Sequence, residues 1–420
     1  MSQPNVVIVG AGFAGIRVAK GLSRAKVKVT VIDRSNHHLF QPLLYQVATA
    51  TLSPAAIASP IRGILRYQAN TEVVLAEVTG VNSKSRRVLA GEREFPFDYL
   101  VLATGARHSY FGHDEWEKFA PGLKAIPDAT AIRQKILYAF ELAEMESDAT
   151  TRENLLRFIL VGGGPTGVEM AGAIAELSHR ALASDFRRID PRSAKVILIE
   201  AGPRLLNAFP EMLSLKAKKS LERLGVEVML NARVQGINET GVALENSRIF
   251  SRTVIWTAGV MASPVGKWLG VETDRAGRVK VGADLSLPGE PNVFVLGDAA
   301  HVLDEKGQPL PGVAPVAMQE GQFIAELIRK RIAGKATPKV FRYFNKGNLA
   351  TVGRSSAVAD LGRVHLSGWL AWMAWLFVHI FYLIGFRNRL IVMTEWAWAY
   401  FTFQRGSRLI YSDYRKGVDK

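Results

Sequence analysis

The 420-residue sequence contains no cysteine. This absence excludes disulfides, thiolate metal sites, iron–sulfur clusters and any redox-active dithiol. The start of the chain also lacks the basic region and apolar stretch of a secretory signal, so we expect the protein to face the cytoplasm. Hydrophobic residues make up 48% of the sequence, which is enough to fill the cores of two or three domains.

Acidic residues are scarce in the C-terminal part of the chain. From residue 329 onward there are 16 Lys and Arg against 4 Asp and Glu, and this segment carries most of the net charge of +15. A basic tail is typical of proteins that bind nucleic acid or an anionic membrane surface. Five of the eight Trp lie between Trp369 and Trp398, in the most apolar stretch of the sequence. Because basic residues beside a Trp-rich apolar helix are typical of a membrane interface, we expect an anionic lipid surface and no nucleic acid as partner.

The first chemical motif lies near the start of the chain. A β-branched run at 6–9 predicts a buried strand, which leads into Gly10-x-Gly12-x-x-Gly15, a helical pattern and a second strand that ends in Asp33. In a dinucleotide fingerprint the three glycines permit the tight turn, the close approach of a pyrophosphate and the packing of helix on strand. The helix N-terminus binds the phosphates, and the acid accepts hydrogen bonds from a ribose.

A second fingerprint follows about 150 residues later, with the strand 158–161, the turn Gly162-x-Gly164-x-x-Gly167 and the acid Glu200 at the end of a later strand. Two such units predict two dinucleotides, placed so that a hydride passes from one to the other. A duplicated fold with one inactive site is the alternative. The two acids favour NADH over NADPH because either carboxylate would repel a 2′-phosphate, although Arg204 nearby weakens this inference.

Further strand ends complete the pattern. Predicted strands run into Ala103-Thr-Gly105, Thr257-Ala-Gly259 and Gly297-Asp298, and a helix is predicted from about Ala317 to Arg331. Residues 57–66 are compatible with a short helix. The pair His37-His38 has no partner at metal-ligand spacing, so no metal site is expected.

In this order, the motifs resemble the two-dinucleotide-domain flavoproteins related to glutathione reductase. The absence of cysteine removes the dithiol reductases and the sulfide:quinone oxidoreductases of that superfamily. The segments 38–46 and 312–319, with Trp396-Ala-Trp398 in the tail, are similar to type II NADH dehydrogenases. The resemblance implies a single-subunit NADH:quinone oxidoreductase that does not pump protons, with FAD in the first unit and NADH in the second.

The resemblance also implies site residues. For non-covalently bound FAD these are Gly10, Gly12, Phe13, Ala14, Gly15, Asp33, Arg34, Ala103, Thr104, Gly105, Asp298, Val316 and Ala317. For NADH they are Gly162, Gly164, Pro165, Thr166, Gly167, Glu169, Glu200, Ala258 and Gly259. For the quinone they are Ala314, Pro315, Met318 and Gln319.

Two of these residues are candidates for catalysis, Glu169 and Gln319. The quinone motif of the family has Gln where this chain has Pro315, which leaves Gln319 to bind a quinone carbonyl. The alternative is that the Gln319 side chain accepts hydrogen bonds from backbone N–H groups at the start of the following helix. Glu169 resembles the acid of the family near the contact of nicotinamide and flavin, but Thr166-x-x-Glu169 is also a capping-box pattern.

The apolar tail has three possible structures. Residues 366–386 carry no formal charge, and this segment is long enough for one membrane span. Trp369, Trp372 and Trp375 recur at helical spacing, and later polar residues recur every seven positions, as in an amphipathic helix. We expect two helices that lie in one leaflet, as the resemblance implies, and the alternatives are a span and a buried core helix.

The sequence thus predicts an α/β protein with two Rossmann-like, glutathione-reductase-like domains and a C-terminal amphipathic-helical region that binds the membrane. The predicted FAD-binding domain comprises 1–125 and 262–335, the NADH-binding domain 126–261 and the anchoring region 336–420. A monotopic protein on the cytoplasmic side of the cell membrane is expected, and the resemblance implies a homodimer. Two other functions stay open: a soluble NADH-dependent reductase of a ferredoxin-like carrier, and a membrane-attached, NAD-responsive flavoprotein sensor.

Overall fold

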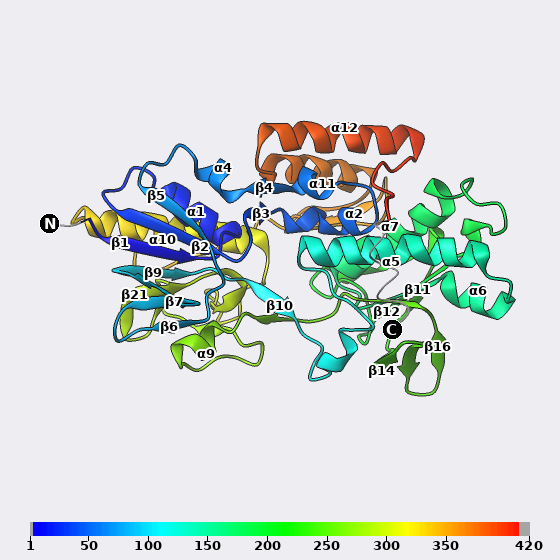
Figure 1. Ribbon diagram of the computed structural model, residues 1–420, viewed down its shortest axis with the longest axis horizontal. Coiled ribbons are helices and arrows are strands. Elements are labelled where there is room, and N and C mark those ends of the chain that lie inside the picture. Colours follow the sequence, from blue (N-terminus) through cyan, green and yellow to red (C-terminus); the bar gives the residue numbers. More distant parts are fainter. Residues whose placement is uncertain (1–2, 411–420) are drawn as a thin grey trace. The chain divides into compact units, whose positions relative to one another are not determined.

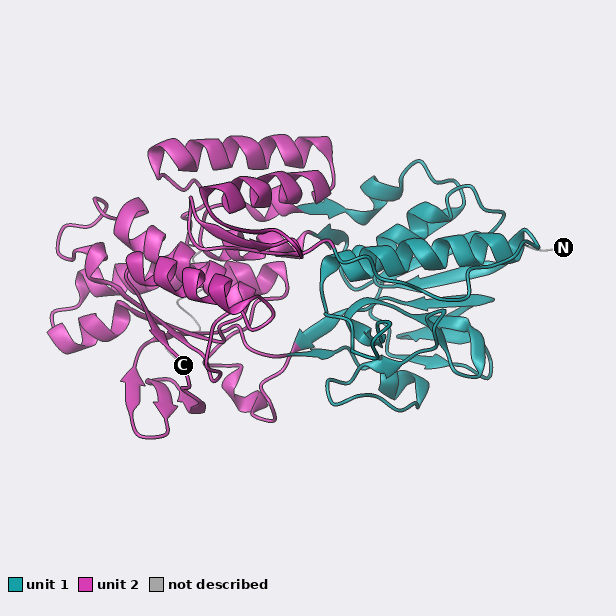
Figure 2. Cartoon of the chain, turned by 180° about the vertical axis from the view of Figure 1, so that it is seen from behind, with its two compact units in different colours: residues 1–39, 58–107, 260–345 teal, residues 40–57, 108–259, 346–420 magenta. Residues whose placement is uncertain are grey.

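The computed structural model describes residues 3–410. The chain forms two compact units, drawn in separate colours in Figure 2. Unit 1 comprises residues 1–39, 58–107 and 260–345, and unit 2 comprises residues 40–57, 108–259 and 346–420. Each unit therefore collects segments that are far apart in the sequence. The predicted boundaries of the FAD-binding domain, the NADH-binding domain and the anchoring region stay a prediction, because the two units are defined by contacts and not by nucleotide binding.

Unit 1 is built on a six-stranded sheet with the order β20-β21-β9-β1-β2-β5. Its strands are β1 (Asn5–Val9), β2 (Lys28–Asp33), β5 (Thr71–Leu75), β9 (Tyr99–Leu102), β20 (Ser286–Leu287) and β21 (Glu290–Val295). β1 pairs in parallel with both β2 and β9, and only β20 runs antiparallel to its neighbour. The central strand is wholly apolar after its first residue because both of its faces are covered. The first βαβ unit is therefore formed as the sequence predicts.

Two helices of unit 1 pack closely against each other, α1 (Phe13–Gly21) and α10 (Ala314–Ile332). A Cβ at Gly321 would lie 2.5 Å from the Ala14 carbonyl oxygen, and a Cβ at Gly21 would overlap Ala325. Glycine at these crossing points lets α10 lie against the nucleotide-binding helix. The unit also contains β3 (His37–Leu39), β4 (Ala58–Pro60), α4 (Ile61–Leu65), β6 (Gly80–Asn82), β7 (Arg87–Ala90), β8 (Arg93–Pro96), α9 (Val265–Leu269) and the 3-10 turn η5 (Gly297–Ala299).

Unit 2 contains a four-stranded parallel sheet with the order β13-β12-β11-β17. These strands are β11 (Arg157–Val161), β12 (Lys195–Ile199), β13 (Val226–Met229) and β17 (Thr253–Trp256). The principal helices near it are α5 (Ile126–Met145), α6 (Ala149–Leu155), α7 (Pro165–Glu176) and α8 (Glu211–Arg223). A small antiparallel sheet is formed by β14 (Val234–Asn238), β15 (Gly241–Leu244) and β16 (Arg248–Phe250). The second fingerprint therefore also lies in a Rossmann-like βαβ arrangement.

The C-terminal part of unit 2 is a three-stranded antiparallel sheet followed by two helices (Figure 1). Its elements are β23 (Asn348–Thr351), β24 (Ala357–Asp360), β25 (His365–Gly368), α11 (Trp369–Tyr382) and α12 (Phe386–Thr402). α11 packs on this sheet, and α12 contacts both α11 and the short helix α3 (Pro54–Ile57). Within residues 3–410, no helix is long and apolar enough to cross a membrane.

The apolar side chains of α11 and α12 lie largely on the outside. Asn388, a polar residue near the start of α12, is only 7% exposed, whereas Phe377 is 75% and Phe401 80% exposed. The other large exposed apolar side chains of the two helices are Trp369, Leu370, Met373, Phe381, Phe386, Leu390, Met393 and Trp398. This set of ten residues is called the apolar face below. The two helices therefore turn a large apolar surface outward, and the alternative of a buried core helix is wrong.

One sequence expectation in unit 1 fails. Residues 57–66 do not form one helix, because Ala58–Pro60 pairs as strand β4 with β3 and separates α3 from α4. Proline disfavours helical conformation in the residue before it and removes one backbone donor. Pro60 therefore marks the interruption.

Candidate functional site

The two glycine loops have the same geometry. In unit 1 a Cβ at Gly10 would overlap the Ala103 carbonyl oxygen, and one at Gly15 would overlap the Gly10 carbonyl oxygen, whereas a Cβ at Gly12 would meet nothing within 4 Å. Gly10 has a φ of +96°, which side-chain-bearing residues rarely adopt. The first and third glycines are thus needed for packing, and the second leaves space above the backbone for a phosphate.

The loop of unit 2 repeats this arrangement. Gly162 has a φ of +113° and lies against Ala258, and a Cβ at Gly167 would overlap the Gly162 carbonyl oxygen. A Cβ at Gly164 would meet nothing within 4 Å. Both loops can therefore admit a pyrophosphate at the N-terminus of the helix that follows.

The two strand-end acids also occupy equivalent positions. Asp33 Oδ2 accepts a hydrogen bond from Ala11 N at 2.7 Å, and Glu200 Oε2 accepts one from Gly163 N at 2.6 Å. Ala11 and Gly163 are the second residues of their respective loops. Each carboxylate thus braces its glycine loop and retains further lone pairs for a ribose hydroxyl. This geometry places Glu200 at the position of Asp33 although its distance along the sequence differs.

Arg204, which weakened the inference of NADH over NADPH, is engaged elsewhere. Its guanidinium Nη2 donates to the Asn207 carbonyl oxygen at 3.1 Å. The carboxylate of Glu200 accepts hydrogen bonds from the backbone N–H groups of Gly163 and Gly202. The charge argument against a 2′-phosphate stays a prediction.

His38 is a candidate cofactor ligand that the sequence motifs did not single out. The side chain is 3% exposed, and its Nδ1 lies 2.9 Å from the Ala11 carbonyl oxygen. Burial lowers the pKa of His38, so the ring is neutral, Nδ1 donates to Ala11 and Nε2 is left as an acceptor. Nε2 is buried and has no hydrogen-bond partner among residues 3–410. An orphaned acceptor beside an open glycine loop fits a ligand with hydroxyl groups, such as the ribose or ribityl chain of FAD.

The strand-end pair Gly297-Asp298 is held by a buried carboxyl group. Glu320 is 1% exposed, and its Oε2 accepts a hydrogen bond from Gly297 N at 2.5 Å. Burial, reinforced by the charge of Asp298, raises the pKa of Glu320 to about 8. Glu320 therefore fixes the turn that presents Asp298, which was predicted to contact FAD.

The remaining predicted FAD residues lie in unit 1 near the same sheet edge. Thr104 shares a hydrogen bond with Ser263 after strand β9, and Arg34 directly follows Asp33. Val316 and Ala317 are buried in the first turn of α10. Phe13 and Ala14 begin α1, and the Phe13 ring meets the His38 ring edge-on with centroids 5.3 Å apart.

The predicted quinone motif forms the start of α10. The helix begins at Ala314, so Pro315 occupies one of the first two helical positions, where its missing N–H costs nothing. Gln319 Nε2 donates to the Phe344 carbonyl oxygen at 2.9 Å, and its Oε1 accepts from Phe344 N at 3.0 Å. Because both ends of its amide bind the backbone of Phe344, the predicted alternative that Gln319 satisfies the start of α10 is wrong.

Glu169 lies on α7, but it is not a helix cap. The helix begins at Pro165 with Gly164 as N-cap and no side-chain cap, so the capping-box interpretation is wrong. Glu169 Oε1 instead faces Thr351 N at 3.4 Å. Burial raises the pKa of Glu169 to about 8, with partial compensation from Thr351 N. The carboxyl group therefore holds a proton at neutral pH and can donate or accept one.

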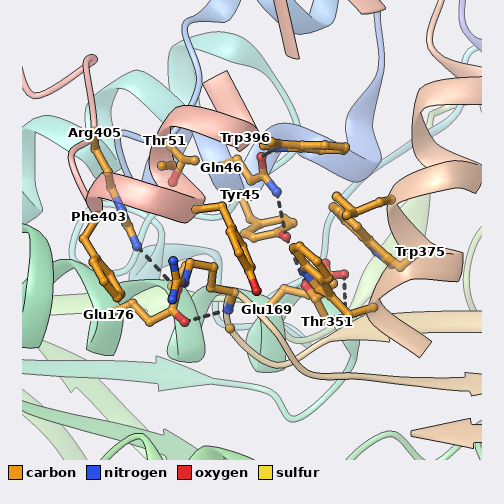
Figure 3. A pocket seen from close by; sticks show the side chains of 17 residues that line it. Tyr45, Gln46, Thr51, Glu169, Glu176, Thr351, Trp375, Trp396, Phe403 and Arg405 are labelled. Carbon is orange, nitrogen blue, oxygen red and sulfur yellow. Dashed lines mark hydrogen bonds and ion pairs between the residues drawn. The ribbon is translucent and has the colours of Figure 1, made fainter. Parts of the chain in front are cut away.

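Glu169 lines a cavity of about 90 Å³ within unit 2 (Figure 3). One wall is the face of α7 that carries Glu169, Ala173 and Glu176, which lie on one side of the helix at spacings of four and three. The cavity is otherwise lined by residues of α2 (Leu44–Ala48) and the segment after it, the end of β23 and the β23–β24 turn, α11, α12 and the segment after α12. These are Tyr45, Gln46, Thr51, Thr351, Gly353, Arg354, Trp372, Trp375, Leu376, Trp396, Ala399, Tyr400, Phe403 and Arg405.

A chain of hydrogen bonds leads along this cavity from α12 toward Glu169 (Figure 3). Trp396 Nε1 donates to Gln46 Oε1 at 2.7 Å, and Gln46 Nε2 donates to Tyr45 Oη at 3.0 Å. Tyr45 Oη in turn lies 3.0 Å from Thr351 Oγ1, and burial raises the pKa of Tyr45. Since the indole can only donate, the orientation of the Gln46 amide is set from α12.

Sequence reasoning therefore missed several residues at these sites. Tyr45 and Gln46 belong to the segment that carried the family resemblance, but nothing in the sequence indicated that they meet α12. Glu320 directly follows Gln319, and its position on the apolar face of the predicted helix is the sequence feature that indicates a buried glutamate. Arg354 and Arg405 had no sequence signal, since their positions depend on tertiary contacts.

Two family descriptions match the chain. Residues 4–321 match the pyridine nucleotide-disulphide oxidoreductases, and residues 345–405 match the NDH2 C-terminal domain. The chain is 45% identical to the type II NADH:quinone oxidoreductase NdhA of Mycobacterium tuberculosis over 97% of this chain and 89% of that protein. It is 46% identical to Ndh of the same organism over 96% of this chain and 90% of the relative.

Solved structures show the same fold. The structure of NDH2 from Plasmodium falciparum in complex with NADH superposes with a TM-score of 0.88 at 20% identity, covering 96% of this chain and 99% of that one. The sulfide:quinone oxidoreductase from Aquifex aeolicus superposes with a TM-score of 0.71 at 18% identity, covering 95% of each chain. At these identities the superpositions support the fold.

Proposed function

Because the chain belongs to the type II NADH:quinone oxidoreductases, we propose that it oxidises NADH and reduces a membrane quinone without pumping protons. The overall reaction is NADH + H⁺ + quinone → NAD⁺ + quinol. The observation that carries the proposal is the pair of open glycine loops, each braced by a strand-end acid, in a chain of this family. Two complete sites are needed if one dinucleotide reduces the other.

FAD is assigned to unit 1. When bound, FAD supplies the chemistry that takes a hydride from NADH and passes electrons to the quinone. Gly12 leaves room for its pyrophosphate, Asp33 accepts from a ribose, and the orphaned His38 Nε2 accepts from a hydroxyl group. Glu320 holds the turn that presents Asp298.

NADH is assigned to the glycine loop of unit 2. Gly164 leaves room for its pyrophosphate, and Glu200 accepts from a ribose diol while it repels a 2′-phosphate. Glu169, with a pKa of about 8, lines the cavity of this unit and can hold or release a proton near neutral pH. We propose that it exchanges a proton during quinone reduction.

The quinone is assigned to the cavity of unit 2. Its walls combine aromatic side chains with a proton-bearing carboxyl group, a composition typical of sites for a flat apolar ring with polar oxygens. The predicted quinone residues Ala314, Pro315, Met318 and Gln319 belong to unit 1 and do not line this cavity, and their role in quinone binding stays a separate proposal. Gln319 can bind a quinone carbonyl only if it releases Phe344.

We propose that the apolar face of α11 and α12 attaches the protein to one leaflet on the cytoplasmic side of the cell membrane. Large apolar side chains that point outward are stabilised by transfer into lipid. The exposed Arg387 at the start of α12 is placed to meet anionic headgroups. The family resemblance is the sole support for a homodimer.

Stopped-flow spectroscopy tests this function. FAD-loaded protein in detergent should bleach at the flavin absorbance when mixed with NADH, and the absorbance should return on mixing with a quinone analogue. A soluble carrier reductase would bleach but reoxidise slowly with quinone and would need no detergent. A sensor would bind NADH without multiple turnovers, and either result would refute the proposal.

A further inference from the structure

At the end of the cavity that is remote from Glu169, the carboxylate of Glu176 is bound by the guanidinium of Arg405 and by the backbone N–H of Arg354. Arg405, from the segment after α12, lies with Nη2 3.7 Å from Glu176 Oε2 and donates through Nη1 to the Thr49 carbonyl oxygen at 2.7 Å. Glu176 Oε1 accepts from Arg354 N at 2.6 Å. Arg405 is therefore used in attaching the tail, whereas only the backbone of Arg354 is held by this carboxylate.

The side chain of Arg354 is held by aromatic rings. Its guanidinium carbon lies 4.0 Å from the centroid of the Phe403 ring and 4.5 Å from that of the Tyr400 ring. Stacking on a ring face leaves the donors at the edge of the guanidinium plane free. Among residues 3–410 the buried Nη1 of Arg354 has no hydrogen-bond partner. A buried cationic donor without an acceptor is costly, so this position is suited to an acceptor supplied by a ligand.

The charges that line the cavity favour an acceptor with negative character. The lining contains Arg354 and Arg405 against Glu169 and Glu176. Burial raises the pKa of Glu169 to about 8, so that Glu169 is largely neutral at pH 7 and the lining carries a net positive charge. Glu169 and Glu176 are seven residues apart on one helix, which is about 10 Å along its axis. One end of the cavity thus offers a carboxyl proton and the other a fixed cation.

We propose that Arg354 donates a hydrogen bond to one carbonyl oxygen of the quinone. The inference rests on the proposed function and assigns one further residue to quinone binding. A quinone is neutral when it enters, and both of its oxygens gain negative charge as two electrons arrive and before two protons complete the quinol. A cation fixed at one oxygen stabilises that charge, while the second oxygen is left for a proton donor.

Binding can be measured without turnover, because Trp372, Trp375 and Trp396 line the same cavity. Full-length FAD-loaded protein is titrated with a soluble ubiquinone analogue in the absence of NADH, and quenching of tryptophan fluorescence gives the dissociation constant. Arg354→Met should weaken quinone binding by about tenfold or more, the usual effect of a charge-assisted hydrogen bond. The KM for quinone should rise by the same factor relative to the KM for NADH. Arg354→Lys keeps the cation and should recover part of the affinity.

Arg363→Met is the matched control, since Arg363 is exposed on the β24–β25 turn and does not line the cavity. The control should match the unaltered protein in affinity and melting temperature. If quinone affinity and melting temperature fall together in Arg354→Met and Arg354→Lys, Arg354 only holds Tyr400 and Phe403 in place. The proposal would then be wrong. Unchanged affinity in both variants would also overturn it.

Two further outcomes separate this inference from the proposed function. If the unaltered protein bleaches with NADH but reduces no quinone, the proposed function fails. The second outcome has two parts: quinone is reduced normally, and vesicles of anionic phospholipid, added without quinone, quench the same tryptophans. If this quenching is lost when Arg354 is replaced, the site holds a lipid phosphate. In that case the inference about Arg354 fails while the proposed function stands.

Discussion

The protonation of Glu169 should make the stability of the protein depend on pH in a way that Glu169→Gln removes. The pKa of Glu169 is raised from its ordinary value of 4.5 to about 8 because the carboxyl group is buried in the cavity. Between these two values the folded protein keeps a proton that the unfolded chain has released. The free energy of unfolding therefore decreases as the pH rises through this window and levels off above the folded pKa.

The magnitude follows from the width of the window. Each pH unit within it removes about 1.4 kcal/mol per group, so about 2 kcal/mol is lost between pH 6 and pH 8 once partial solvent access through the cavity is allowed for. Glutamine cannot lose a proton, so the variant lacks this loss. For a unit of 150–250 residues, 1 kcal/mol corresponds to about 2–4 °C in melting temperature. Relative to the unaltered protein, Glu169→Gln should thus gain about 4–8 °C between pH 6 and pH 8.

Differential scanning fluorimetry of FAD-saturated protein at both pH values measures this difference. Glu320, whose pKa is also raised to about 8, contributes to both proteins and cancels in the comparison. Glu245→Gln, at an exposed position of the same unit, is the control for the loss of one carboxylate and should show no such gain. If the variant and the unaltered protein differ by the same amount at pH 6 and at pH 8, Glu169 is already ionised at pH 6 and the reasoning fails.

Three further predictions concern the nucleotide, the membrane and the quinone. Glu200→Gln should raise the ratio of kcat/KM for NADPH to that for NADH by about tenfold, because it removes the repulsion of a 2′-phosphate; turnover of NADPH as fast as NADH by the unaltered protein would contradict this. Phe377→Lys combined with Phe401→Lys should release the protein from anionic vesicles in a flotation assay, whereas Phe250→Lys, an exposed phenylalanine on β16, should leave it bound. Gln319→Ala should raise the quinone KM or lower kcat; if neither changes in a folded variant, Gln319 serves only to hold residue 344.

A deletion is a poorer test of membrane attachment than these point substitutions. Removing the chain beyond about residue 365 looks from the sequence like the removal of a separate anchor. In the structure it would also remove most of β25, which is one of the two strands that pair with β24. It would further remove Trp396, which orients Gln46, and Arg405, which binds the Thr49 carbonyl oxygen. The tail is thus part of the core of unit 2.

The local features of the nucleotide sites were predictable because they depend on short stretches of chain. Gly10 and Gly162 need left-handed backbone conformations, and a strand, a glycine turn and a helix must follow each other directly. Pro60, by contrast, divided a predicted helix because pairing of β4 with β3 outweighed local propensity. The equivalence of Glu200 to Asp33 did not follow from spacing and is visible only in their matching hydrogen bonds to the glycine loops.

The sequence by itself determined two dinucleotide units, their order, the chemical type of their acids and an apolar tail with a basic character. These properties follow from glycine conformation, hydrophobic periodicity and charge, which are local. The tertiary structure decided which side of α12 faces outward, that Gln319 binds the backbone of Phe344, and that Tyr45, Glu169, Arg354 and Trp396 line one cavity. These residues lie up to about 350 positions apart in the chain. Their contacts, and the raised pKa values of Tyr45 and Glu169, exist only once packing has removed the side chains from water.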